Sequence, residues 1–493
     1  MIQIHPFKFW FVTGSQHLYG DDTLAEVAQH ARQITQALTE SGMLPYAIEF
    51  KPVVTTPEAI RNVLAEANNH PDCAGVIAWM HTFSPAKMWI TGLAELRKPI
   101  LHLHTQFNQD VPWSSIDMDF MNLNQSAHGD REFGFIGARL RMARKVVAGH
   151  WQSARVQHRM AQWMRVAAAI ADGLDTKIAR FGDNMRNVAV TEGDKVEAQM
   201  KFGWSVNGYG VGDLVEHINA VKEGSLNALL DEYRTLYRIT PGADTEYGWN
   251  SIREQARIEL GLRSFLTDGG FKGFTTTFED LHGMSQLPGL AVQRLMADGY
   301  GFGGEGDWKT AALLRTLKVM AGMEGTSFME DYTYHLHEGD ELVLGAHMLE
   351  VCPTIAADRP VIDVQPLGIG GKADPARLIF DGRKGRGLVA SIIDMGDKFR
   401  LVVNEINAVK AEQNMPKLPV ARVLWQPEPN LEVAAEAWIY AGGAHHTVFS
   451  YNITAEQLFD YTDILGIDYV LINKDTSLLE LRQKLREQSR RHS

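Results

Sequence analysis

The segments FWFVTG at residues 9–14, DTLAEVAQHARQITQALTESG at 22–42 and AIEFKPVV at 47–54 decide the fold of the first part of the chain. The first and third are short apolar runs that predict strands, whereas the second has apolar residues at helical spacing and stops at Gly42. The alternation continues with a helix over 56–69, a strand over 73–83, a helix over 84–96 and a strand over 99–107. This rhythm predicts a parallel, doubly wound sheet.

The pattern changes twice farther along the chain. Helical segments dominate residues 117–174, and KIARFG at 177–182 then restarts an α/β pattern. After residue 325 come short strands separated by Gly-containing turns, which are typical of an antiparallel barrel or sandwich. We therefore expect an N-terminal α/β domain at 1–175, a central α/β domain at 176–325 and a C-terminal antiparallel β domain with terminal helices at 326–493.

Composition narrows the class of protein. The 493 residues carry a net charge of −12, and the only basic run is RQKLREQSRRHS at the end, so we expect no nucleic-acid partner. No apolar stretch approaches 18 residues and no signal peptide precedes the first strand, so we expect no membrane span. The two cysteines, Cys73 and Cys352, lie in apolar contexts, which indicates a reducing compartment and a soluble, cytoplasmic protein.

The candidate catalytic and metal-binding residues lie in three segments, GGEGDWKTAALLR at 303–315, GTSFMEDYTYH at 325–335 and ELVLGAHMLEVCP at 341–353. Glu305, Glu330 and His347 are polar groups in Gly-rich or apolar segments, and burying them is costly unless a partner such as a divalent metal compensates. The segment AGGAHHTVFS at 441–450 offers a fourth ligand, His445 or His446, and the spacing does not choose between them. Two carboxylates and two imidazoles suit Mn²⁺ or a related divalent ion.

Two other interpretations compete for this region. Glu305 could cap the following helix and the histidines could be hydrogen-bonded core residues, although Asp307 is the better cap because it directly precedes Trp308. The glycines of GFGGEG at 301–306 satisfy a dinucleotide-binding pattern, which makes an NAD-dependent oxidoreductase a rival function. We expect helix rather than strand before these glycines, and Glu305 would turn a carboxylate toward a pyrophosphate, which disfavours that rival.

The motifs WFVTGSQHLYG, HTFSPAKMWI, NQSAHGDREFGFI, FTTTFEDLHG, GEGDWKTAALLR, FMEDYTYH, HMLEVCP and AGGAHHTVFS together resemble the L-arabinose isomerase family. The resemblance runs from about Phe9 to Phe449. It implies two Rossmann-like α/β domains followed by a C-terminal antiparallel β-barrel-like domain. It also implies one Mn²⁺ per subunit, or another divalent ion. The ligands implied by the matching motifs are Glu305, Glu330, His347 and His446.

The resemblance further implies conversion of L-arabinose to L-ribulose through a metal-stabilised enediol, the first step of L-arabinose catabolism, with D-galactose to D-tagatose as a side activity. Glu305 and Glu330 are the expected proton-transfer pair. A related isomerase for another sugar, such as L-fucose, is the nearest alternative, and a hydride shift is the alternative route. The family implies homohexamers or tetramers. The implied substrate-pocket residues, some reaching a neighbour's site, are Gln16, Leu18, Gln125, His128, Met185 and Phe278.

Overall fold

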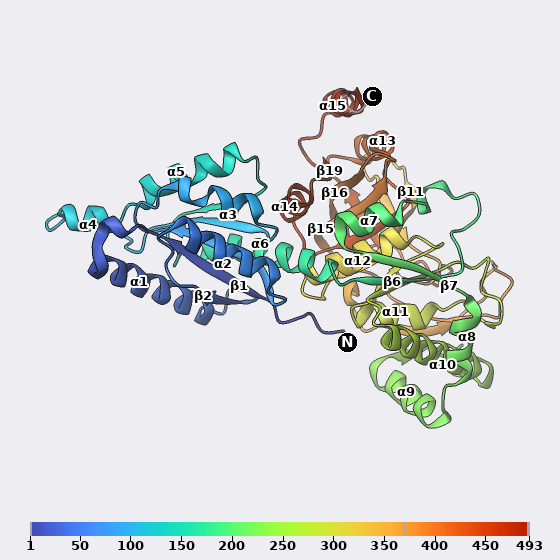
Figure 1. Cartoon of the computed structure of the whole chain (residues 1–493). Helices are drawn as coiled ribbons and strands as arrows, with labels where there is room; N and C mark the ends of the chain where they lie inside the picture. The colour runs from blue at the N-terminus through green and yellow to red at the C-terminus, as the bar shows by residue number, and fades with distance from the viewer. Residues whose placement is uncertain (1, 369, 491–493) are drawn as a thin grey trace. The chain divides into compact units, whose positions relative to one another are not determined.

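A computed structural model describes residues 2–368 and 370–490 of the chain, which divides into two compact units (Figure 1). One unit contains Ile4–Ala171, and the other contains the chain from Asp172 onward with the few residues before Ile4. Within the described ranges, no helix combines the length and the apolarity that a membrane crossing requires. Each unit is built around its own sheets.

The Ile4–Ala171 unit is a parallel five-stranded sheet in the order β2-β1-β3-β4-β5. Its strands are β1 (Lys8–Gly14), β2 (Ala47–Phe50), β3 (Cys73–Met80), β4 (Ile100–His104) and β5 (Lys145–Ala148). Its helices are α1 (Gly20–Glu40), α2 (Pro57–Asn69), α3 (Ile90–Glu95), α4 (Met118–Leu123), α5 (Ser126–Arg139) and α6 (Ala154–Gly173), the last of which ends in the other unit. The parallel sheet predicted from the strand–helix rhythm is confirmed, with one strand, β5, inside the stretch expected to be helical.

Alternation along β1 explains why helices cover both faces of this sheet. Phe9 and Phe11 join one buried cluster with residues of α1 and α6, whereas Trp10 and Val12 join another with residues of α2, α3 and α5. Successive side chains of a strand point to opposite faces, so a strand that is apolar at every position must be covered twice. The helix α1 begins at Gly20, two residues before the expected Asp22, which places Asp21 and Asp22 in its positively polarised first turn.

The second unit begins with another parallel sheet, in the order β10-β9-β6-β7. Its strands are β6 (Lys177–Phe181), β7 (Ser205–Tyr209), β9 (Gly273–Thr276) and β10 (Gly301–Gly303). The accompanying helices are α7 (Lys195–Phe202), α8 (Val211–Asn219), α9 (Glu223–Leu236), α10 (Glu246–Gly269), α11 (Gly289–Ala297) and α12 (Trp308–Met320). Because α12 is buried at every position, it forms the centre of this unit.

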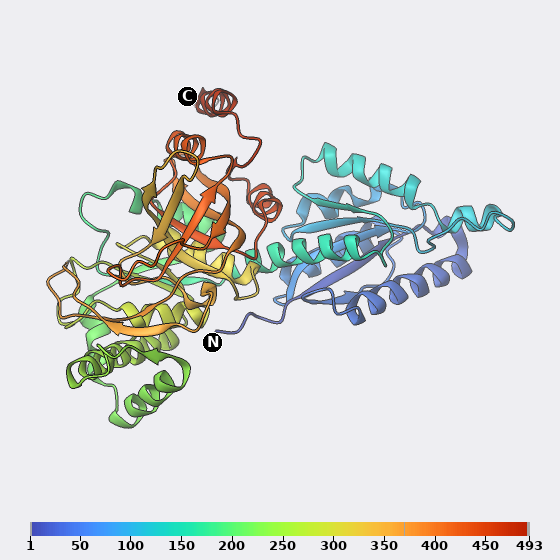
Figure 2. The ribbon, with the colours of Figure 1, turned by 180° about the vertical axis from the view of Figure 1, so that it is seen from behind.

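The last part of the chain closes into a six-stranded antiparallel barrel, in the order β15-β18-β11-β12-β17-β16 with β16 returning to β15 (Figure 2). Its strands are β11 (Thr326–His335), β12 (Leu342–Ala346), β15 (Gly385–Asp394), β16 (Phe399–Val409), β17 (Arg422–Pro427) and β18 (His446–Ser450). Closure removes the unpaired edges that an open sheet would expose. Gly345 is required for this packing, since a Cβ there would lie 1.9 Å from Cζ3 of Trp425.

Some of the expected barrel strands form a separate sheet. The strand β13 (Val361–Val364) pairs with β14 (Ala376–Ile379) and with β8 (Arg238–Ile239), which comes from the central part of the chain. The chain ends with α13 (Leu431–Ala441), α14 (Ala455–Leu465), β19 (Asp468–Ile472), which adds to β16, and α15 (Leu478–Arg490). Barrel closure follows from hydrogen-bond pairing between β15 and β16, which strand length and turn residues did not reveal.

A buried ion pair ties α12 to the end of α6 within the second unit. Asp172 receives hydrogen bonds of 2.9 Å from both Nε and one terminal nitrogen of Arg315, and the side chains are 2% and 0% exposed. Burial alone would raise the pKa of Asp172, but the charges of Arg315 and Lys272 outweigh it and lower the pKa.

We expect Asp172→Asn to reduce the free energy of unfolding by about 3–5 kcal/mol at neutral pH, since it leaves the buried guanidinium of Arg315 without its negatively charged partner. Chemical denaturation measures the loss, and Asp175→Asn, whose side chain is 86% exposed, is the control. Because the folded-state pKa is lowered, the stabilisation exists above the ordinary value of 3.8 and disappears as the pH falls below it. Equal stability of the two variants would contradict this role.

Candidate active site

The loop between β10 and α12 carries Glu305 in a strained conformation. Its backbone φ is +58°, a left-handed value that costs a non-glycine residue about 1–3 kcal/mol and is often kept at functional sites. The amide of Met185 donates to the carbonyl of Glu305 over 2.9 Å, and the amide of Gly306 donates to Thr276 over 3.1 Å. These two bonds, one from the Met185 loop and one to the end of β9, hold Glu305 and the next residue in place.

The barrel brings the other predicted ligands to this loop. In the register of the strands, Glu330 on β11 pairs with His446 on β18 and with Ala346 on β12, directly before His347. The Nε2 atom of His347 lies 4.0 Å from a carboxylate oxygen of Glu330, and Nε2 of His446 lies 3.9 Å from one of Glu305. Antiparallel pairing therefore gathers residues that are more than a hundred positions apart.

Each of these two imidazoles has one nitrogen held by a carboxylate. Nδ1 of His347 lies 2.6 Å from Oε2 of Glu350, and Nδ1 of His446 lies 3.1 Å from Oδ2 of Asp307. Nε2 of His446 is buried and, among the residues that the structure describes, has no hydrogen-bond partner. Metal-binding histidines commonly show this arrangement, with an outer carboxylate fixing the ring and the opposite nitrogen left for the ion. The donor set therefore fits a divalent cation.

His445 also reaches this cluster. Its Nε2 lies 3.4 Å from Oε2 of Glu305, and ligand atoms of Glu305, His445 and His446 all lie within 4.8 Å of one another. The two histidines differ in environment, since the side chain of His445 is 36% exposed whereas that of His446 is fully buried. The structure thus shows a group able to bind a metal that includes both histidines left open by the spacing.

Neighbouring groups keep the carboxylates of Glu305 and Asp307 ionised. A hydrogen bond with His445 lowers the pKa of Glu305, against the effect of its partial burial. Burial would raise the pKa of Asp307, but Lys309 and His446 reverse the effect and lower it. Burial lowers the pKa of His446, which leaves its imidazole neutral and able to act as a ligand.

The remaining predicted pocket residues lie in different places. Met185 joins the Glu305 loop through its backbone, and Phe278 lies two residues beyond Thr276, whose carbonyl binds that loop. The others belong to the Ile4–Ala171 unit, where the side chain of Leu18 is 83% exposed and the ring of His128 packs edge-on against Phe83. These other residues are Gln16, Leu18, Gln125 and His128.

The glycine-rich pattern at 301–306 has a structural explanation. Contrary to expectation, helix α11 ends at Ala297 and the strand β10 precedes the loop. A Cβ at Gly301 would lie 2.0 Å from the carbonyl oxygen of Ala311, and one at Gly303 would lie 2.2 Å from that of Asp307. The glycines are therefore required for β10 to pack against α12, and a dinucleotide is not needed to explain them.

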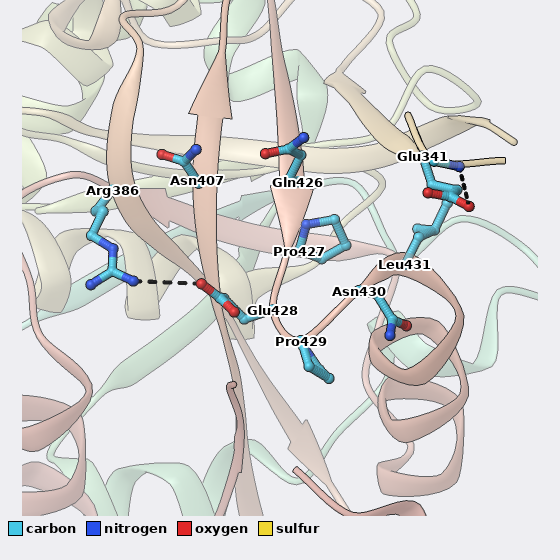
Figure 3. A pocket seen from close by; sticks show the side chains of 10 residues that line it. Glu341, Arg386, Asn407, Gln426, Pro427, Glu428, Pro429, Asn430 and Leu431 are labelled. Carbon is cyan, nitrogen blue, oxygen red and sulfur yellow. Dashed lines mark hydrogen bonds and ion pairs between the residues drawn. The ribbon is translucent and has the colours of Figure 1, made fainter. Parts of the chain in front are cut away.

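A separate hollow of about 430 Å³ lies on the barrel between β15, β16, β17 and the start of α13 (Figure 3). Arg386 and Glu428 face each other across it at 3.5 Å, and Glu341 adds a second carboxylate to the lining. The hollow has no histidine in its lining and none of the predicted ligands. It is distinct from the candidate site around Glu305.

Glu350 is a functional candidate that the sequence analysis missed. It lies three residues after His347 in HMLE, and this spacing was the one available signal. Its carboxylate accepts from the amide of Leu349 over 3.0 Å and holds Nδ1 of His347. We expect Glu350→Gln to weaken divalent-metal affinity about 10- to 100-fold, as is typical for partners of metal-binding histidines. Metal titration by calorimetry measures the change, with the exposed Glu338→Gln as control. Unchanged affinity would reduce Glu350 to a packing role.

Comparison with known proteins covers nearly the whole chain. Family models described as the L-arabinose isomerase N-terminal, central and C-terminal domains match residues 3–175, 177–323 and 325–468. An L-arabinose isomerase of Anoxybacillus flavithermus is 66% identical over 487 residues, covering 99% of this chain and 97% of that protein. The enzyme of Geobacillus stearothermophilus is also 66% identical, with 99% and 98% covered, and that of Halalkalibacterium halodurans is 63% identical, with 98% of each covered.

Proposed function

The chain belongs to the L-arabinose isomerase family, and from this premise we propose that it interconverts L-arabinose and L-ribulose. The observation that carries the proposal is the convergence of Glu305, Glu330, His347 and His446, with Nε2 of His446 buried and unpartnered among the described residues. A sugar isomerase needs a carboxylate able to move a proton and a means of stabilising the enediolate, and this cluster offers both.

We assign the metal-ligand role to Glu305, Glu330, His347 and His446, and Mn²⁺ is the ion proposed. His446 is preferred to His445 because its free nitrogen is buried, whereas His445 is partly exposed and bonds to Glu305. When bound, the divalent ion supplies Lewis-acid polarisation of the sugar oxygens.

The protein's own groups would move the protons. The hydrogen on C2 of the open-chain aldose is acidic because the C1 carbonyl accepts the electron pair left behind. An ionised carboxylate takes this proton and returns it to C1, while a second proton passes from the C2 hydroxyl to the oxygen on C1. Glu305, kept ionised by His445, is suited to the first role, and Glu330, whose carboxylate lies 4.0 Å from Nε2 of His347, is the second candidate.

We also propose the fold-level and cellular details that accompany this function. The second unit is proposed to consist of a central domain at 176–325 and a barrel domain at 326–493. Activity on D-galactose and a cytoplasmic location are proposed, the latter because Cys73 and Cys352 are both free and buried.

The chain is further proposed to form homohexamers, with tetramers as the alternative. Large apolar side chains are exposed in the Ile4–Ala171 unit, where Leu18, Trp113 and Met118 are 83%, 85% and 65% accessible. A subunit contact would bury some of this exposed apolar surface. If His128 completes a neighbour's pocket, mixing His128→Ala and Glu305→Ala protomers should recover part of the activity. Absence of recovery in verified mixed oligomers would assign each site to one chain.

An isomerisation assay tests the main proposal. The purified chain is stripped with a chelator and offered L-arabinose, D-galactose and L-fucose with and without added Mn²⁺. We expect ketose formation to be greatest with L-arabinose and to depend on the added ion. A preference for L-fucose would move the chain to a different substrate, and equal rates without metal would remove the metal from the proposal.

A further inference from the structure

A hollow of about 260 Å³ lies at one end of the parallel sheet in the Ile4–Ala171 unit. It lies beyond the carboxyl ends of β4 and β5 and beside the first turn of α5, and none of its described lining residues is acidic. In open α/β sheets, this end of the strands is where ligands bind. The residues that line it and matter here are His104, Thr105, Ser126, Ala127 and His150.

The start of α5 faces this hollow without a side-chain cap. The cap position is Gln125, whose side chain makes no capping bond and instead donates to Asn122 over 3.3 Å. The first amides of a helix have no partner inside the helix, and they carry the positive end of its dipole. A 14-residue helix that begins in this way is suited to binding an anion.

The hydroxyl of Ser126 is an independent indication of a ligand. Ser126 is 0% exposed and lines the hollow, and its Oγ has no hydrogen-bond partner among the residues that the structure describes. A buried hydroxyl without a partner is costly, so such groups are normally satisfied by protein, water or ligand. Neighbouring polar groups are already engaged, since Thr105 Oγ1 donates to Gln106 and accepts from the amide of Trp151.

His104 adds a potential cation to the same hollow. Its Nδ1 lies 2.6 Å from one oxygen of Asp130, whose other oxygen lies 2.7 Å from Nε2 of the buried His102. The hydrogen bond with Asp130 raises the pKa of His104, and the His104 side chain stays 37% exposed. Both oxygens of Asp130 are thus occupied by imidazoles, which leaves Nε2 of His104 as a donor for a ligand.

We propose that this hollow is a second ligand site, which binds a small oxyanion such as a phosphate group through Ser126, the first amides of α5 and His104. The proposed contacts use none of the side chains assigned to the sugar or the metal, although Gln125 and His128 lie on the same turn of α5. Inorganic phosphate and the phosphate group of a small metabolite share this chemistry. The volume suits a ligand no larger than a small phosphorylated metabolite, as pockets for drug-sized molecules start at about 300 Å³.

Isothermal titration of the full-length chain with inorganic phosphate, a pentose 5-phosphate and acetate tests the site. Ser126→Ala and His104→Gln should each weaken phosphate binding about 10- to 100-fold, the range for a hydrogen bond to a charged group. Ser153→Ala, at the start of α6 and outside the hollow, should bind as the unaltered chain does. Tighter binding of the pentose phosphate would identify a metabolite as the ligand, and equal binding would identify free phosphate.

A second variant keeps the test valid if the first ones fold poorly. Ser126→Asp places a carboxylate in the first turn of α5, where negative charge stabilises a helix, and it should also exclude phosphate from the hollow. We expect this variant to show no phosphate binding, and its circular dichroism spectrum in phosphate-free buffer shows whether the chain is folded. Unaltered phosphate affinity in Ser126→Asp, or no phosphate binding by the unaltered chain at millimolar concentration, would overturn the proposal.

Discussion

Replacing Glu305 or Glu330 by glutamine is expected to reduce kcat by about 10²–10⁴-fold at saturating Mn²⁺, the range supplied by general acid–base groups. The amide keeps the size and one oxygen donor of the carboxylate but cannot accept a proton at neutral pH. Glu305 is the more sensitive position, because its carboxylate is held ionised by His445 and its strained backbone is bonded to the amide of Met185.

Steady-state kinetics over a range of Mn²⁺ concentrations separate proton transfer from metal binding. A defect that disappears as Mn²⁺ rises would belong to metal affinity, whereas a residual loss in kcat belongs to proton transfer. Glu338→Gln, an exposed acid beyond β11, should leave kcat unchanged.

The fate of the C2 hydrogen is a second, independent test of whether a carboxylate transfers the proton. Transfer through a carboxylate should allow some solvent deuterium to enter the ketose at C1, measured by mass spectrometry before the product re-exchanges. Complete retention of the substrate hydrogen would support a direct hydride shift and would leave both glutamates as metal ligands alone.

The parallel sheets were predictable because their signal is local. Alternating apolar strands and amphipathic helices, such as 9–14 and 22–42, encode βαβ units within a few dozen residues. The short strands and turns predicted an antiparallel barrel or sandwich without choosing between them, and the barrel is confirmed by the pairing of β15 with β16 and of β18 with β11. The transfer of β13 to a sheet with β8 depends on residues more than a hundred positions apart, which no local pattern reports.

The candidate site was predictable as a set of residue types in unusual contexts, but its geometry was not. Glu305 was a candidate because it is a carboxylate in a glycine loop and has no capping role. The structure adds that its backbone φ is positive, which no sequence pattern indicated. The residues could not choose between His445 and His446. Strand register distinguishes their environments, since His446 pairs with Glu330 and is buried, whereas its neighbour stays partly exposed. Glu350 was missed because its role depends on a contact with a ring, not on its position in a motif.

His446→Ala and His347→Ala are expected to weaken Mn²⁺ binding by more than about 100-fold and to abolish isomerisation. This loss exceeds the effect of about 10- to 100-fold that is typical of a residue that only hydrogen-bonds to a metal ligand, such as Glu350. Each change removes a buried imidazole nitrogen that lies about 4 Å from a glutamate carboxylate. Metal stoichiometry measured by elemental analysis after dialysis is the readout, and circular dichroism confirms that the barrel remains folded.

The neighbouring histidine provides the decisive control. If His446 is the ligand, His445→Ala should keep one Mn²⁺ per chain, because His445 acts on Glu305 through a hydrogen bond and lies at the exposed edge of the cluster. Its loss should instead let the pKa of Glu305 rise toward the ordinary value, because the His445 hydrogen bond is the main cause of its lowering. Full metal occupancy in His446→Ala together with loss in His445→Ala would reverse the assignment and make the exposed imidazole the ligand.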